Sequence, residues 1–74
     1  MKLNTTFIRR QLSYWKVTQK ELARVLHTNP RTVERWLNNS PLPSTEYIVR
    51  LSIVLDCRVE DLVILEESDR LTLL

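Results

Sequence analysis

Apolar residues recur at spacings of three and four over most of this chain, which is the period of an amphipathic helix. In the N-terminal part, Ile8, Leu12 and Trp15 share one such face. Asn4 precedes them, and asparagine is favoured just before a helix because its side chain accepts a backbone N–H. The pattern predicts a first helix from Asn4 to about Tyr14, with this apolar face in the core.

A second helix is predicted to begin after Thr18. Thr18 and Glu21 have the spacing of a capping box, in which each side chain accepts from the other residue's backbone N–H. Val17 stands where it can pack against Leu22 as a hydrophobic staple. The apolar residues of this helix are Leu22, Ala23, Val25 and Leu26.

A third helix is predicted after only two intervening residues. Asn29 is a suitable N-cap, and Pro30 occupies the first helical position, where its missing N–H costs no helical hydrogen bond. Val33, Trp36 and Leu37 form one apolar stripe. The sequence therefore predicts a short helix over residues 29–37, separated from the second by a tight turn.

The remaining chain predicts a loop and two further helices. Residues 38–43 read Asn-Asn-Ser-Pro-Leu-Pro, which favours a loop. Ser44 is the expected cap of the fourth helix, and residues 56–58 separate it from a short fifth one. The expected apolar positions are Tyr47, Ile48, Leu51, Val54 and Leu55, then Val59, Leu62, Val63 and Ile64. The pattern indicates an all-α, five-helix domain over residues 1–67 and a tail, 68–74, that could serve as an interaction segment.

Composition excludes several classes of function. The 74 residues include no glycine, so glycine-rich phosphate loops and dinucleotide fingerprints are excluded. The one cysteine excludes an internal disulfide and multi-cysteine zinc sites. We expect no enzyme, metal or cofactor, because no catalytic constellation accompanies the lone histidine. No apolar run suits a membrane span or a signal peptide, so a cytoplasmic protein is expected.

Charge is divided unevenly along the chain. Residues 1–36 hold eight basic and two acidic side chains, whereas residues 37–74 hold three basic and seven acidic ones. Such asymmetry favours a polyanion as the partner of the first half.

The short third helix has the chemistry of a DNA-reading helix. Arg31 and Arg35 are four residues apart and share a face, and a guanidinium can donate to both acceptors of a guanine edge. Thr32 can contact a phosphate or a thymine methyl group. The plainer alternative is a solvated helix face in which these arginines pair with Glu34 or with another chain.

In this order of elements the chain resembles the Cro and repressor type of helix-turn-helix family, also called XRE-like or lambda-repressor-like. The resemblance runs from about Ile8 to Val63. Its most specific stretch is Thr18-Gln19-Lys20-Glu21-Leu22-Ala23, similar to the family's TQxELA. Arg35-Trp36, Pro43-Ser44, Leu51, Leu55 and Glu60-Asp61-Leu62 follow in the family's order.

The resemblance implies a set of DNA contacts. Gln19 would meet a phosphate at the start of the second helix, and Pro30 would at most touch a thymine methyl group. Asn38, Asn39 and Ser40 would reach phosphates through their backbone N–H groups. The remaining residues implied at the DNA are Asn29, Arg31, Thr32 and Arg35.

Two departures from the family pattern give structural expectations. Leu12 and Leu37 stand where many members have a partly buried Arg–Glu pair, so the two leucines are expected to touch. Glycines that commonly end the helices are replaced by four other residues. We expect a positive φ at His27, Asn39 and Asp56, but not at Lys16.

The chain is therefore predicted to be a DNA-binding transcriptional regulator, a repressor of phage or mobile-element type. A homodimer on a palindromic site is expected, and the candidate dimer or partner residues are Ile64, Leu65, Leu71, Leu73 and Leu74. The alternative is a modulator or antitoxin that acts by binding a repressor or a toxin. Cys57 is expected to be buried and inert, and both tryptophans are expected to pack in the core.

Overall fold

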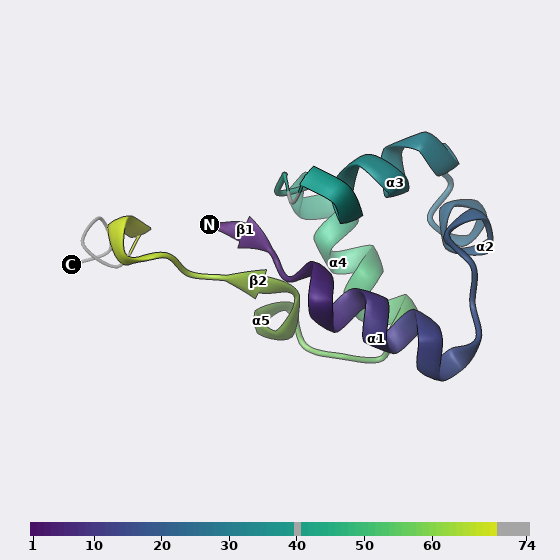
Figure 1. Ribbon diagram of the computed structural model, residues 1–74, viewed down its shortest axis with the longest axis horizontal. Coiled ribbons are helices and arrows are strands. Elements are labelled where there is room, and N and C mark those ends of the chain that lie inside the picture. Colours follow the sequence, from purple (N-terminus) through teal and green to yellow (C-terminus); the bar gives the residue numbers. More distant parts are fainter. Residues whose placement is uncertain (40, 70–74) are drawn as a thin grey trace.

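Five helices, α1 to α5, follow one another along the chain in the computed structural model, which describes residues 1–39 and 41–69 (Figure 1). A further helical turn spans residues 67–69. A two-stranded sheet joins the start of the chain to the segment after the last helix. The elements are β1 (Lys2–Leu3), α1 (Thr5–Trp15), α2 (Gln19–Val25), α3 (Pro30–Asn39), α4 (Thr45–Val54), α5 (Val59–Leu62) and β2 (Val63–Ile64). The predicted all-α, five-helix architecture is confirmed.

The predicted caps of the first two helices are present. The Asn4 side chain accepts from the backbone N–H of Phe7 at 3.2 Å. Thr18 and Glu21 form the capping box, with bonds of 3.1 Å to the threonine oxygen and 3.4 Å to the glutamate oxygen. Ser44 precedes α4 as predicted, but its side chain makes no capping hydrogen bond.

One apolar cluster holds the helices together. Its buried members are Leu3, Ile8, Leu12, Leu22, Ala23, Leu26, Val33, Trp36, Leu37, Ile48, Leu51, Leu55 and Leu62. No polar or charged side chain is buried among the described residues. Burial of apolar area, worth about 25 cal/mol per Å², is therefore the main stabilising contribution.

Leu12 and Leu37 both belong to this cluster, at 6% and 5% exposure. They come from α1 and α3, which pack against each other. Two leucines thus occupy core positions where many proteins of the Cro and repressor type have an Arg–Glu pair.

Trp15 departs from the prediction of core packing. It is 55% exposed and lies edge-on to Tyr14, with ring centroids 5.1 Å apart. Trp15 is the last residue of α1, where the chain already turns away toward α2. Trp15 has the helical spacing from Leu12 that suits a core position, but no described element lies beside it to cover the indole.

Three turns close in the same way without glycine. In each, a residue with φ between 50° and 58° is followed by a residue whose N–H reaches back five positions. The closing bonds are Val17 N to Leu12 O at 2.9 Å, Thr28 N to Ala23 O at 2.9 Å and Cys57 N to Ser52 O at 3.0 Å. This Schellman geometry needs a left-handed residue whatever its side chain.

The left-handed residues are Lys16, His27 and Asp56. The expectation was correct for His27 and Asp56 but wrong for Lys16, because the closing bond after α1 imposes the left-handed conformation on a lysine as well. It was also wrong for Asn39, which is the last residue of α3 and has helical backbone.

His27→Gly is expected to leave the free energy of unfolding unchanged or to raise it by up to about 1 kcal/mol, because glycine adopts φ 58° without steric cost. Urea unfolding measures the change. Thr28→Gly is the matched control and should lower stability by about 0.5–1 kcal/mol, since its φ is not positive. Equal destabilisation by both changes would assign a stabilising contact to the imidazole.

The fifth helix is shorter than predicted. It ends at Leu62, and Val63 and Ile64 form β2 instead, antiparallel to β1 with Leu3 opposite Val63. β-branched residues suit a strand, and the pairing places Leu3 in the core at 1% exposure. Figure 1 shows this pair and the following segment projecting from the helical body.

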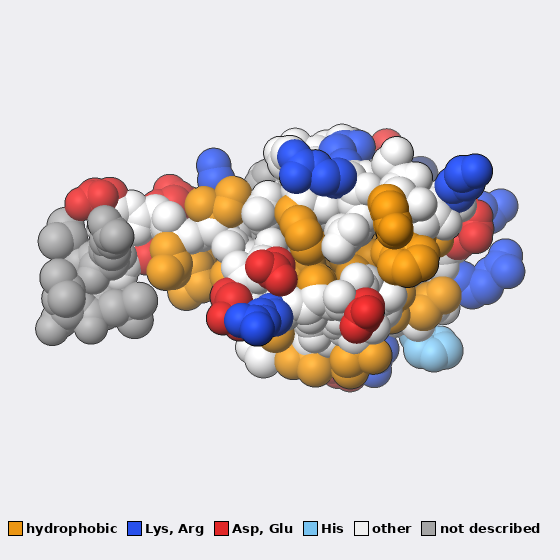
Figure 2. Space-filling model, turned by 90° about the horizontal axis from the view of Figure 1, so that it is seen from below, with side chains coloured by type: hydrophobic (Ala, Val, Ile, Leu, Met, Phe, Trp, Pro, Cys, Tyr) orange, Lys and Arg blue, Asp and Glu red, His pale blue; other side chains and the backbone are white. Residues whose placement is uncertain are grey.

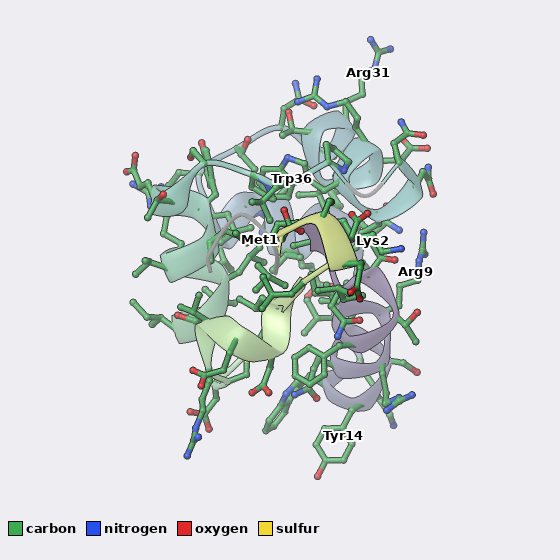
Figure 3. The ribbon with its side chains drawn as sticks, turned by 90° about the vertical axis from the view of Figure 1, so that its left-hand side faces the viewer. Met1, Lys2, Arg9, Tyr14, Arg31 and Trp36 are labelled. Carbon is green, nitrogen blue, oxygen red and sulfur yellow. The ribbon has the colours of Figure 1, made fainter. Side chains whose placement is uncertain are left out.

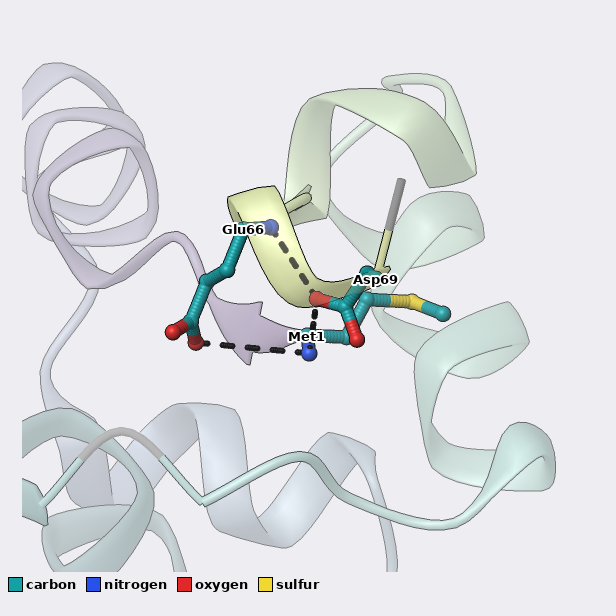
Figure 4. Close-up of polar contacts among 3 residues, drawn as sticks. All are labelled: Met1, Glu66 and Asp69. Atoms are coloured by element: carbon teal, nitrogen blue, oxygen red, sulfur yellow. Dashed lines mark hydrogen bonds and ion pairs between the residues drawn. The ribbon is translucent and has the colours of Figure 1, made fainter. Parts of the chain in front are cut away.

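The two ends of the described chain meet beside this sheet (Figure 4). The Met1 amino group donates to Asp69 and lies 4.0 Å from Glu66. The Asp69 carboxylate also accepts from the Glu66 backbone N–H at 3.0 Å. The Met1 ammonium, with this backbone bond, lowers the pKa of Asp69 below its ordinary value.

Candidate functional site

The exposed side of α2 and α3 holds most of the predicted functional residues. The two helices pack against each other across the turn at His27. Arg50 from α4 fixes that turn, because its Nη1 donates to the Leu26 carbonyl at 3.0 Å. Arg50 also pairs with Glu46 at 2.6 Å and lies 5.5 Å from the Tyr47 ring centroid.

Helix α3 separates its apolar and polar side chains cleanly. Its stripe of Val33, Trp36 and Leu37 is buried, as predicted. Arg31 and Arg35 are exposed, and their guanidinium groups have no hydrogen-bond or ion-pair partner within the described part of the chain. Figure 3 shows Arg31 extending outward at the top of the molecule, away from the core. Two guanidinium groups are therefore free to bind an anion or a base edge.

The start of α3 is ordered by its cap. The Asn29 side-chain oxygen accepts from the Arg31 backbone N–H at 2.8 Å. The Asn29 NH₂ group takes no part in this bond, so it remains to donate to another molecule. Pro30 is exposed beside it and presents only apolar ring atoms.

Gln19 is the first residue of α2 and is half-buried. At this position the backbone N–H has no partner inside the helix, and the positive end of the helix dipole faces outward. The position therefore suits contact with a phosphate, as the resemblance implies.

Three of the polar residues of α3 border a groove. Thr32, Arg35 and Asn39 form one wall, and the loop after α3 with the start of α4 forms the other. The groove has a volume of about 470 Å³, and its further lining residues are Trp36, Pro41, Leu42, Pro43, Ser44 and Tyr47. The sequence indicated Thr32, Arg35 and Asn39 as site residues, whereas the prolines and Tyr47 were expected only as loop and core residues.

Asn38 and Asn39 belong to α3 rather than to a loop. The expectation that their backbone N–H groups meet phosphates is wrong, since an N–H at this depth in a helix donates to the carbonyl four residues earlier. Their side chains are exposed. Ser40 lies outside the described residues.

Arg9 is a residue of this site that sequence reasoning did not single out. It lies on α1, and its Nη2 donates to the Leu37 carbonyl at 3.2 Å and to the Asn38 side-chain oxygen at 3.0 Å. No local pattern indicates this contact, because it joins residues 28 and 29 positions apart.

The opposite side of the molecule has a different character. Figure 2 views the face turned away from α3 and shows several hydrophobic patches between acidic and basic groups. Ile64 and Leu65, on and just after β2, are 37% and 54% exposed. Leu71, Leu73 and Leu74, predicted with them as partner residues, lie outside the described residues.

Other candidate chemistry is weak. Cys57 is only partly buried, and its burial, with Asp61 and Asp56 nearby, raises the pKa of its thiol. The described residues contain no group of three or more side chains that could hold a metal ion. None of the helices described is long and apolar enough to span a membrane.

Comparison with known proteins gives one match. The family model HTH_3, a helix-turn-helix, matches residues 16–62, which include α2, α3, α4 and α5. No curated protein and no solved structure matches the chain significantly.

Proposed function

Because the chain belongs to the helix-turn-helix family of DNA-binding regulators, we propose that it regulates transcription by binding a specific DNA sequence with α3 in the major groove. One observation carries the proposal. Arg31 and Arg35 stand four residues apart on the exposed face of α3, and both guanidinium groups lack partners among the described residues. The major groove of DNA is about 12 Å wide and admits one helix.

The roles of the site residues follow from their positions. Arg31, Thr32 and Arg35 read base edges or touch the adjoining backbone, and Asn29 donates through its NH₂ group. Gln19 at the start of α2 binds a phosphate. Pro30 offers an apolar contact to a thymine methyl group, and Asn38 and Asn39 meet phosphates through their side chains.

We further propose that the protein acts in the cytoplasm as a homodimer on a palindromic site, as a repressor of phage or mobile-element type. Two α3 helices would then enter major grooves about 34 Å apart. Ile64 and Leu65 support this, because both are exposed apolar residues on a segment that projects from the helical body.

Selection from random-sequence DNA tests the proposal. Repeated rounds with the wild-type chain should enrich an inverted repeat whose half-sites are about one helical turn apart. Sedimentation should then show two chains per selected duplex. If no sequence is enriched over the starting pool, sequence-specific binding is wrong. Enrichment of a single unrepeated motif, bound by one chain, would support sequence-specific DNA binding but contradict the proposed homodimer.

A modulator or antitoxin that binds a repressor or toxin is the second candidate. The exposed Ile64 and Leu65 favour it equally, since they would also suit a different protein chain. Ile64→Ser with Leu65→Ser separates the two. If these changes abolish regulation of a reporter while purified chain keeps its full DNA affinity, a partner protein is involved.

A further inference from the structure

Arg9 connects α1 to the C-terminal end of α3. Its Nη2 group donates to the Leu37 carbonyl at 3.2 Å and to Asn38 Oδ1 at 3.0 Å. Figure 3 shows Arg9 at the side of the molecule, between α1 and α3, while Arg31 points outward from α3. The arginine therefore stands beside the helix proposed to enter the groove.

The contact determines what Asn38 presents to its surroundings. A guanidinium has only donors, so the amide atom that faces Arg9 is the oxygen. The Asn38 NH₂ group is turned away from Arg9, and it has no hydrogen-bond partner in residues 1–39 and 41–69. The Nε and Nη1 groups of Arg9 have none there either. The end of α3 thus carries a group of unused donors.

The position of Arg9 also changes the electrostatics at the end of α3. The C-terminal end of a helix carries a partial negative charge of about half an elementary charge, which repels anions. Helix α3 has no basic residue in its last turn to compensate. Arg9 supplies the missing positive charge from another helix, directly at one of the last carbonyls.

We propose that Arg9 and Asn38 together form a phosphate-binding site at the C-terminal end of α3. A backbone phosphodiester of DNA beside the major groove would accept from the Arg9 guanidinium and the Asn38 NH₂ group. This inference rests on the proposed function and deepens it. With Gln19 at the start of α2, the site would hold the duplex at a second point and so fix the tilt of α3 in the groove.

The salt dependence of DNA binding tests the site. Wild type, Arg9→Gln and Arg10→Gln are compared for binding to a short random-sequence duplex, because phosphate contacts do not depend on sequence. Arg10 is the matched control, since it is the adjacent arginine on α1 and is likewise exposed. Arg9→Gln should reduce the slope of log affinity against log salt by about 0.9, the value for one phosphate. The loss of affinity between about 50 and 200 mM salt would then shrink about 3-fold, and Arg10→Gln should change it far less.

Asn38→Asp separates phosphate binding from a purely structural role. Aspartate keeps an oxygen for Arg9 and preserves the link to α1, but it replaces the NH₂ donors by a negative charge. The melting temperature should be kept, while affinity for the random duplex falls on the order of tenfold at low salt. If Asn38→Asp keeps full affinity, or if Arg9→Gln and Arg10→Gln have equal slopes, the site is refuted.

Failure of this inference can be distinguished from failure of the proposed function. Wild type that binds no DNA overturns both. Wild type that binds DNA and depends on Arg31 and Arg35, but not on Arg9 and Asn38, overturns the phosphate site alone.

Discussion

Arg35→Ala is expected to weaken binding to the selected DNA site by about 1–3 kcal/mol per half-site, or roughly 5- to 150-fold. The reason is that a guanidinium donating to both acceptors of a guanine edge discriminates between bases by about this much. Arg35 is exposed, is unpaired among the described residues and borders the groove beside α3. The preference for one base pair should disappear, and competition between duplexes changed at single positions measures this.

Arg58→Ala is the control for the Arg35 prediction. It removes the same charge from the start of α5, which lies away from α3 in Figure 1. A general loss of positive charge would weaken all duplexes alike in both variants. If Arg35→Ala lowers affinity no more than Arg58→Ala and leaves every base preference intact, Arg35 does not read a base.

Arg31→Ala distinguishes reading from anchoring within the same helix. If Arg31 contacts a phosphate, its loss weakens binding to specific and random duplexes to the same degree and lowers the slope of log affinity against log salt by about one. If Arg31 contacts a base, its loss mainly weakens binding to the specific duplex. Either outcome places Arg31 at the DNA, whereas unchanged affinity for both duplexes would return it to a solvated helix face.

Local patterns predicted the helices and their starts correctly. Asn4, Thr18 and Glu21 act on residues three positions away, so their roles can be derived from spacing alone. The exposed arginines of α3 follow from the same logic, because a buried stripe of known spacing fixes which side chains face outward.

The contacts that sequence reasoning missed join distant parts of the chain. Leu3 pairs with Val63, and this converts the expected end of the fifth helix into a strand. Arg9 reaches the Leu37 carbonyl near the end of α3, and Arg50 reaches the Leu26 carbonyl just after α2, from 28 and 24 positions away. Each of these arginines is a plain surface residue in the sequence, and only the packing of α1 and α4 gives it a role.

The turns show where a residue-type rule fails. Lysine is uncommon in the left-handed region, yet Lys16 adopts φ 56° because the Val17 N–H closes on the Leu12 carbonyl. The geometry required between α1 and α2 outweighs the side chain's preference. Conversely Asn39, a favourable residue for such a turn, continues the helix.

Leu37→Glu is expected to lower the free energy of unfolding by about 3–5 kcal/mol, because it places an unpaired charge at a core position that is 5% exposed. Total stability is roughly 4–11 kcal/mol for a domain of this size, so the single variant would lose much of its folded population. Urea unfolding followed by circular dichroism measures the change.

Adding Leu12→Arg to Leu37→Glu should restore part of this stability. Leu12 and Leu37 lie on α1 and α3, which pack against each other, so the pair of changes introduces an arginine and a glutamate that can neutralise each other. The interaction energy in the double-mutant cycle should be about 1–3 kcal/mol in favour of the pair. Leu12→Arg with Leu51→Glu is the mismatched control, since Leu51 is also buried but lies on α4, whereas α1 packs mainly against α3 and α5. If both cycles give the same interaction energy, the two positions are not directly coupled, and the apolar pair does not take the place of an ion pair between α1 and α3.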